Sequence, residues 1–256
     1  MAHDKHGDTP LLWQPAAFPL AAQQVKDAYA RVRASLMDDA LFIQDAAQYG
    51  VTVDELDRRM QQPPAQLDSG SSWDWLDGPE HYRRAVLRVL VEAYRSADRH
   101  ELAGPVEVPG NAVHVVAADV HVDGDLVLEE QAVLFVLGKL SVSGALVGRP
   151  GYSVAAAREI ECADGATGGE VLALGGIRCP GTFYFGHNDY SARAAWYDGG
   201  ILVDFERYNA FGRVAVRTRV TDWDFPAAAR VLGLPNDEGD LLGAYTEKLL
   251  SEQGRA

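Results

Sequence analysis

The feature that most constrains this chain is a short β-type repeat near its middle. The stretch LFVLGKLSVSGALVG, residues 134–148, alternates apolar residues with glycine and small polar residues. A period of two is typical of β-strands, because successive side chains of a strand point to opposite faces. A Val-x-Gly-x-Leu pattern within it, residues 136–140, repeats residues 122–126 at an offset of fourteen. Such close repetition indicates stacked β units.

Further copies follow at longer spacings. Residues 158–162 align with residues 138–142 at an offset of twenty, residues 175–179 follow after seventeen, and Ala192 and Ala194 follow after another seventeen. A variable period suits a solenoid, in which each coil supplies short strands and the loops absorb differences in length. We therefore predict an α+β fold with a central parallel β-solenoid. A β-meander or sandwich with glycine-rich hairpins is the alternative.

Helical periodicity flanks the repeat on both sides. We predict a helical N-terminal region over residues 1–102, the β-solenoid over 103–222 and C-terminal helices over 223–256. The apolar stripe of the first helix comprises Val25, Ala28, Tyr29, Val32 and Leu36. A solenoid ends in bare strand edges that invite polymerisation, so it needs caps. We expect the N-terminal helices to close the first coil, and the C-terminal helices to cap the far end or lie along a flank.

The chain has two cysteines, Cys162 and Cys179, which occupy the same position in consecutive repeats. We expect them to be neighbours inside the solenoid, where free thiols behave as small hydrophobic groups. Two cysteines are too few for a disulfide framework or a cysteine-based zinc site. We expect no cofactor and no metal.

The charge balance limits the partners. With 37 acidic and 23 basic residues, the formal net charge is −14. Nucleic-acid binding depends on Lys and Arg, so we expect no nucleic-acid partner. A protein with a basic surface suits this chain better. No stretch approaches the roughly 20 apolar residues of a membrane helix, and the first residues lack a secretory-signal pattern, so we expect a cytoplasmic protein without a membrane role.

The coils resemble a known family. The stretches VHVDGDLVL, VLGKLSVSGALVG and VLALGGIRC are similar to the coils of bactofilin-like, polymer-forming cytoskeletal proteins, which are right-handed β-helices. The stretch YFGHNDYSARA resembles the GHYNDG element of a bacterial subgroup in which a helical region precedes the β-helix. Some members of that subgroup are encoded beside secreted toxins and are suspected immunity proteins. The resemblance covers residues 106–203 and implies a right-handed β-helix with such a role.

Two stretches carry the predicted partner-binding residues. The first holds polar and aromatic residues within twelve positions, and the second is an acidic loop with two tryptophans. Aromatic side chains dominate binding hot spots because they bury much area with few torsions to freeze. These residues can equally brace a turn or fill the core. The predicted residues are His187, Asn188, Asp189, Tyr190, Trp196, Tyr197, Trp73, Asp74 and Trp75.

These observations predict a non-enzymatic binding protein that neutralises a bacterial toxin or effector by direct contact, with a homodimer as a possible assembly. One alternative is a bactofilin-like scaffold that polymerises end to end. Another is a carbohydrate-active β-helix enzyme, because such enzymes use clustered carboxylates on stacked coils. The coils offer Asp119, Asp123, Asp125, Glu159, Glu161 and Asp164. No phosphate-binding loop, nucleophile elbow or HExxH motif occurs in the sequence.

Overall fold

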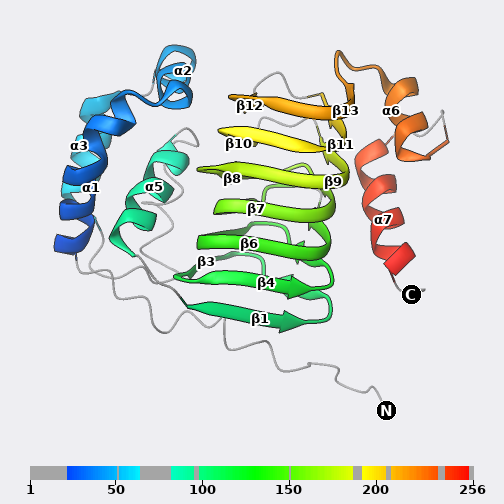
Figure 1. Cartoon of the computed structure of the whole chain (residues 1–256), viewed down its shortest axis with the longest axis horizontal. Coiled ribbons are helices and arrows are strands. Elements are labelled where there is room, and N and C mark those ends of the chain that lie inside the picture. Colours follow the sequence, from blue (N-terminus) through cyan, green and yellow to red (C-terminus); the bar gives the residue numbers. More distant parts are fainter. Residues whose placement is uncertain are drawn as a thin grey trace.

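The computed structural model describes residues 22–50, 52–63, 82–94, 98–149, 151–186, 192–205, 209–235 and 240–253. The middle of the chain forms a right-handed parallel β-solenoid of about six turns, as predicted (Figure 1). The strands are β1 (Arg99–Ala103), β2 (Val106–Val108), β3 (Ala112–Val116), β4 (Asp119–Asp123), β5 (Leu126–Leu128), β6 (Ala132–Gly148), β7 (Val154–Thr167), β8 (Glu170–Ala173), β9 (Gly176–Phe185), β10 (Ala192–Ala194), β11 (Trp196–Asp204), β12 (Ala210–Phe211) and β13 (Val214–Val220). The helices are α1 (Ala22–Met37), α2 (Ala40–Tyr49), α3 (Val53–Gln61), α5 (Arg83–Ala93), α6 (Phe225–Leu232) and α7 (Leu241–Gln253).

Each coil presents three faces. In the first coil β1, β2 and β3 each form one face, and in later coils single strands such as β6 bend round the corners and contribute to all three. We call these the first, second and third faces. Every strand pairing is parallel, so hairpins, which require antiparallel neighbours, are not the basis of the repeat.

The pairing register corrects the spacing of the first repeat. Val122 pairs with Val142, twenty residues later, so the predicted offset of fourteen is wrong. Val136, which the sequence aligned with Val122, lies on the third face and pairs with Val116. The error has a physical origin, because strands on all three faces need the same alternation of inward apolar side chains.

The next two spacings are confirmed, and the last is wrong. Ile160 follows Leu140 by twenty residues and Ile177 follows Ile160 by seventeen. Tyr197, and not the Ala192–Ala194 segment, pairs with Ile177 in the following coil. The alanines lie on the third face, beside β8.

The solenoid interior is a narrow apolar core in which the two cysteines are neighbours, as predicted. Both thiols are free and buried. A hydrogen bond with Cys179, together with burial, raises the pKa of the Cys162 thiol well above its ordinary value. Since the thiolate is the reactive form, the raised pKa makes Cys162 a packing group, and Cys179 is buried in the same apolar core.

Aspartates at the corners join successive coils. Asp119, Asp125 and Asp164 each accept a backbone N–H from the next coil, at 2.7 Å, where the strand ladder is interrupted. Burial raises the pKa of Asp125, and the N–H of Ala145 offsets part of that rise. These three carboxylates therefore satisfy amides that would otherwise lack a partner.

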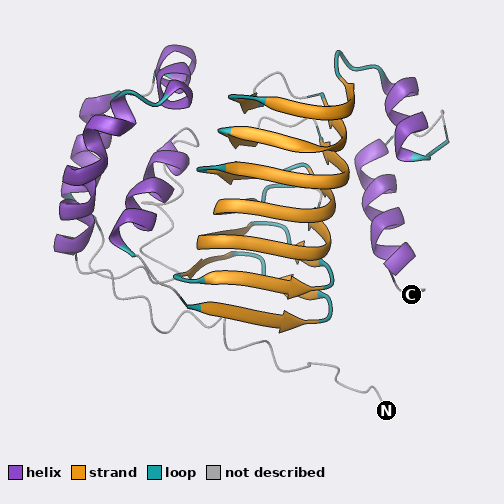
Figure 2. Cartoon of the chain, viewed as in Figure 1, coloured by secondary structure: helices purple, strands orange, loops and turns teal. Residues whose placement is uncertain are grey.

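Helices cover two of the three faces (Figure 2). Outward apolar residues of the third face, such as Phe135 and Leu172, pack with α1, α3 and α5. Outward residues of the second face, such as Val147 and Tyr184, pack with α6 and α7. The expected N-terminal cap is therefore wrong for the described helices, which lie along the flanks of the stack (Figure 1). No described helix is both long and apolar enough to cross a membrane.

The local helix signals in the sequence are largely confirmed. The stripe of α1 is buried as predicted, and Gly50 ends α2 in the left-handed conformation, with φ 67°. The side chain of Thr52 caps α3 by accepting the N–H of Glu55, 3.2 Å away. In a capping box Glu55 would accept the N–H of Thr52 in return, but that N–H donates to the hydroxyl of Tyr82, 3.0 Å away, and Glu55 pairs with Arg58.

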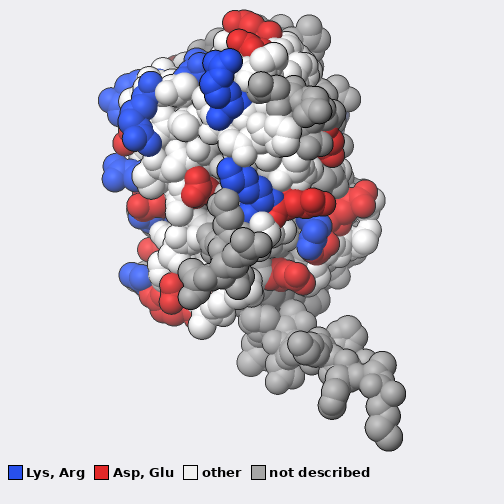
Figure 3. All heavy atoms as spheres, turned by 90° about the vertical axis from the view of Figure 1, so that its right-hand side faces the viewer, with Lys and Arg blue, Asp and Glu red and all other residues white. Residues whose placement is uncertain are grey.

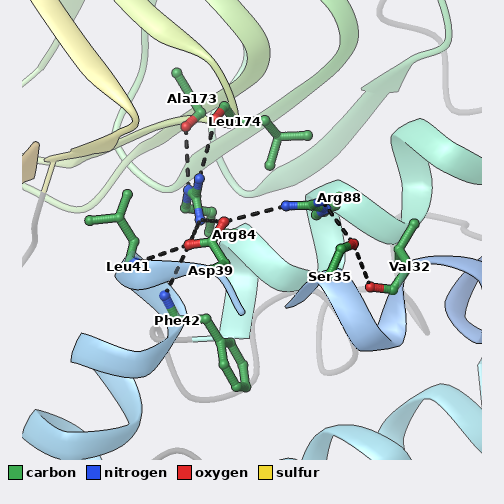
Figure 4. Close-up of polar contacts among 9 residues, drawn as sticks. All are labelled: Val32, Ser35, Asp39, Leu41, Phe42, Arg84, Arg88, Ala173 and Leu174. Atoms are coloured by element: carbon green, nitrogen blue, oxygen red, sulfur yellow. Dashed lines mark hydrogen bonds and ion pairs between the residues drawn. The ribbon is translucent and has the colours of Figure 1, made fainter. Parts of the chain in front are cut away.

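Buried arginines fasten the N-terminal helices to the third face. Arg84 of α5 donates to both carboxylate oxygens of Asp39, at 2.9 Å, and to the carbonyl oxygens of Ala173 and Leu174, at 3.4 and 3.2 Å (Figure 4). Asp39 also caps α2 by accepting the N–H groups of Leu41 and Phe42. The Asp39–Arg84 pair therefore holds α2, α5 and the solenoid together.

A second ion pair lies beside the first. Arg83 of α5 pairs with Glu170 of β8, and both side chains are 3% exposed. The guanidinium also lies 5.2 Å from the centre of the Tyr152 ring.

Burial by itself raises the pKa of Asp39, but Arg84 and the capping N–H groups outweigh burial, so the pKa is lowered.

Substitution of Arg84 by Ala is expected to lower the free energy of unfolding by about 3 kcal/mol, because Asp39 would lose its bidentate partner, and Arg88, 3.3 Å away, and the capping N–H groups would compensate its largely buried charge only in part. The matched control is Arg58→Ala, which removes a largely exposed partner of Glu55 and should cost less than about 1 kcal/mol. Urea unfolding of both variants tests this prediction. Equal losses for the two variants would contradict it.

Candidate functional site

The first face of the solenoid is the candidate site, because no described helix packs on it. It faces the viewer in Figure 1, where β1 and β4 mark its lower end. Inward residues of this face join the apolar core, and outward residues are mostly polar. We call it the uncovered face. Its outward side chains include Arg99, Glu101, Asp119, His121, Lys139, Ser141, Glu159, Glu161, Arg178, Trp196 and Asp198.

Charges on the uncovered face alternate in sign from coil to coil. Lys139 pairs with Glu161 of the next coil, and Arg178 lies 3.8 Å from Asp198. The hydrogen bond from Lys139 lowers the pKa of Glu161 although burial opposes it. The net charge of −14 is therefore not concentrated here. Such pairs stabilise little by themselves, because solvent screens them.

Basic residues gather toward one end of the stack. Figure 3 shows Lys and Arg side chains grouped at its upper left, near the end that holds β12 and β13. Arg213, Arg217 and Arg219 all lie on the final coil. Arg219 pairs with the buried Asp204, whereas the side chain of Arg217 is exposed. The surface field thus changes along the solenoid axis.

Two depressions open on the uncovered face, and Lys139 lines both. The smaller, of about 190 Å³, is bordered by Arg99, Asp119 and His121. The larger, of about 240 Å³, we call the indole pocket. Its lining residues are Lys139, Glu159, Ile160, Glu161, Gly176, Arg178 and Trp196.

The indole pocket exists because one position in a column of outward residues is a glycine, Gly176. Lys139, Glu159, Gly176 and Trp196 stack in one column over four successive coils. A Cβ atom at Gly176 would lie 2.0 Å from Cδ2 and Cε2 of Trp196. The indole ring therefore lies flat on the glycine backbone, half-buried, and forms one wall of the pocket.

The two predicted aromatic residues that the structure describes have different roles. Trp196 lies on the uncovered face, so it remains a candidate for partner contact. Tyr197 is fully buried, and its ring contacts Phe185 and Phe211 in the core. Its ring occupies space left by Gly199, which follows the two cysteines in their column. Burial raises the pKa of its hydroxyl, and the expectation of surface contact by Tyr197 is wrong.

The other predicted partner-binding residues lie outside the described part of the chain. These residues are His187, Asn188, Asp189, Tyr190, Trp73, Asp74 and Trp75.

The sequence predicts no binding role for Gly176 or Arg178, and it places Glu159 and Glu161 only among the carboxylates of the alternative carbohydrate-active enzyme. The signal in the sequence is their alternation with the inward residues Ile160, Cys162, Ile177 and Cys179. Side chains that alternate with inward ones point outward, and those of successive coils share one face. Within the described ranges, no group of three or more His, Cys, Asp or Glu side chains is placed to hold a metal ion.

Comparison with known proteins adds no assignment. A scan against models of protein families and searches of curated proteins and of solved structures gave no match to this chain.

Substitution of Gly176 by Ala is expected to displace the indole ring of Trp196, because the added methyl group would occupy the space of the ring. The indole N–H resonance of Trp196, assigned with Trp196→Phe, should shift strongly, and the free energy of unfolding should fall by about 1 kcal/mol. Ser141→Ala, on the same face but outside the indole pocket, is the control. An unchanged Trp196 resonance in Gly176→Ala would contradict the described stacking.

Proposed function

We propose that this protein is a non-enzymatic binding protein that docks a partner protein on the uncovered face of its solenoid. One observation carries the proposal: the chain's own helices bury the second and third faces and leave the uncovered face as a stiff, polar surface with two depressions. A rigid surface loses little conformational entropy on binding, which favours affinity. A binding site made of loops loses more conformational entropy, because the loops must become ordered when the partner binds.

Within this proposal the partner is a toxic effector, and the chain acts as a cytoplasmic immunity protein. The resemblance of the coils and of YFGHNDYSARA to the bactofilin-like subgroup supports that role. The alternating charges of the uncovered face support specificity for one partner, since a mismatched partner would bring like charges together.

Substitution of Ser141 by Arg, at the centre of the uncovered face, is expected to weaken partner binding at least tenfold by adding bulk and charge to the interface. The partner to test first is the product of the gene immediately upstream, by co-purification at low salt and titration calorimetry. Ser251→Arg places the same change on an exposed position of α7 and should bind like the wild type. Absence of binding by the wild type, or equal binding by Ser141→Arg, would count against the proposal.

A second candidate is an end-to-end scaffold, and the position of the helices favours it. Because the described helices lie along the flanks, β1 pairs only with β4 and β13 only with β11 among the described strands. The final coil carries three arginines, whereas the first coil carries Glu101 and Glu107 and a single arginine, Arg99, which pairs with Glu101. Stacking of the two ends would bring opposite charges together and pair both free edges.

End-to-end assembly predicts filaments in negative-stain electron microscopy at low salt, with shortening as the salt concentration rises. Arg217→Glu should reduce filament length by reversing a charge on the final coil. Arg31→Glu changes an exposed position of α1 and is the control, since α1 lies along a flank of the stack (Figure 1). A monodisperse wild-type monomer or dimer at every salt concentration would remove this candidate.

A further inference from the structure

The indole pocket is the part of the uncovered face with the most distinctive chemistry. Trp196 supplies an aromatic surface, and its position is fixed from below by Gly176. The remaining lining side chains that reach outward are charged. An aromatic ring held beside carboxylates offers a cation both a ring face and a counter-ion.

The charged groups of the pocket are not equally engaged. Lys139 and Glu161 form an ion pair with each other, and Arg178 lies 3.8 Å from Asp198. Glu159 is exposed, and its side chain forms no hydrogen bond or ion pair with any residue that the structure describes. Two basic and two acidic side chains line the pocket, and the carboxylate of Glu159 is therefore the charged group left to pair with a ligand.

We propose that the indole pocket receives a cationic side chain, arginine or lysine, that the partner protein presents to the uncovered face. The guanidinium or ammonium group would lie on the ring of Trp196 and pair with the carboxylate of Glu159. This assignment rests on the proposed function, and it names the chemistry of the contact that anchors the partner. Arginine fits better than lysine, because its planar group stacks on aromatic rings and binds a carboxylate through two N–H groups.

The charges favour a cation over an anion. A partner carboxylate would meet Glu159 directly, and the two basic groups nearby already have acidic neighbours. An uncharged apolar side chain could cover the indole ring, but it would remove water from Glu159 without replacing the lost hydrogen bonds. A cationic side chain satisfies both groups at once.

The proposal is tested with N-acetyl-arginine amide as the probe and the indole N–H resonance of Trp196, assigned with Trp196→Phe, as the readout. The full chain should show a saturable shift of that resonance, and N-acetyl-norleucine amide, which is uncharged, should produce none. Glu159→Gln should weaken binding of the arginine probe at least fivefold. Glu130→Gln removes the same charge from an exposed corner outside the pocket and should leave binding unchanged.

Three outcomes would overturn the proposal: no saturable shift of Trp196 with the arginine probe, equal binding of the uncharged probe, or equal weakening by Glu159→Gln and Glu130→Gln. The same pair of variants, measured against the partner protein, separates the two levels of inference. If the partner binds the wild type, and Ser141→Arg weakens that binding while Glu159→Gln does not, the uncovered face is the docking surface and the proposed cationic anchor is wrong. If no partner binds while the probe does, the pocket stands and the proposed function fails.

Discussion

Apolar side chains on the outside of the solenoid are the constraint on which the rest of the structure depends. A coil already directs one set of side chains inward, yet Phe135 and Leu172 on the third face and Val147 and Tyr184 on the second are apolar and point outward. Their exposure would leave a large hydrophobic surface in water. The helices must therefore lie along these two faces, and this placement leaves the first face uncovered by the described helices.

Burial of apolar surface favours helices on the flank but does not decide how they are oriented. The buried charges supply that specificity, because Asp39, Arg84 and the carbonyl oxygens at the end of β8 have complementary positions in one arrangement of the helices. Any sliding of α5 along the face would separate Arg83 from Glu170 and break this buried ion pair. Buried pairs of this kind add little net stability, and their contribution here is to choose one packing over others.

The candidate site was only partly predictable. Trp196 was selected for its type and its neighbours, but Tyr197, selected for the same reasons, is a core residue. Adjacent residues of a strand point to opposite faces, so one of the two had to be inward, and the register of the coils decided which. Glu159 and Gly176 are seventeen residues apart, and only the stacking of two coils shows that they share a pocket.

The sequence by itself determined the parallel solenoid, the helical regions on either side and the contact between the two cysteines. These features follow from local periodicity and from the repetition of inward residues, which are properties of the chain alone. The tertiary structure decided the true length of the first repeat, the location of the helices on the flanks and the identity of the uncovered face. The reason is that strands of all three faces carry the same alternation, so only their pairing distinguishes one face from another.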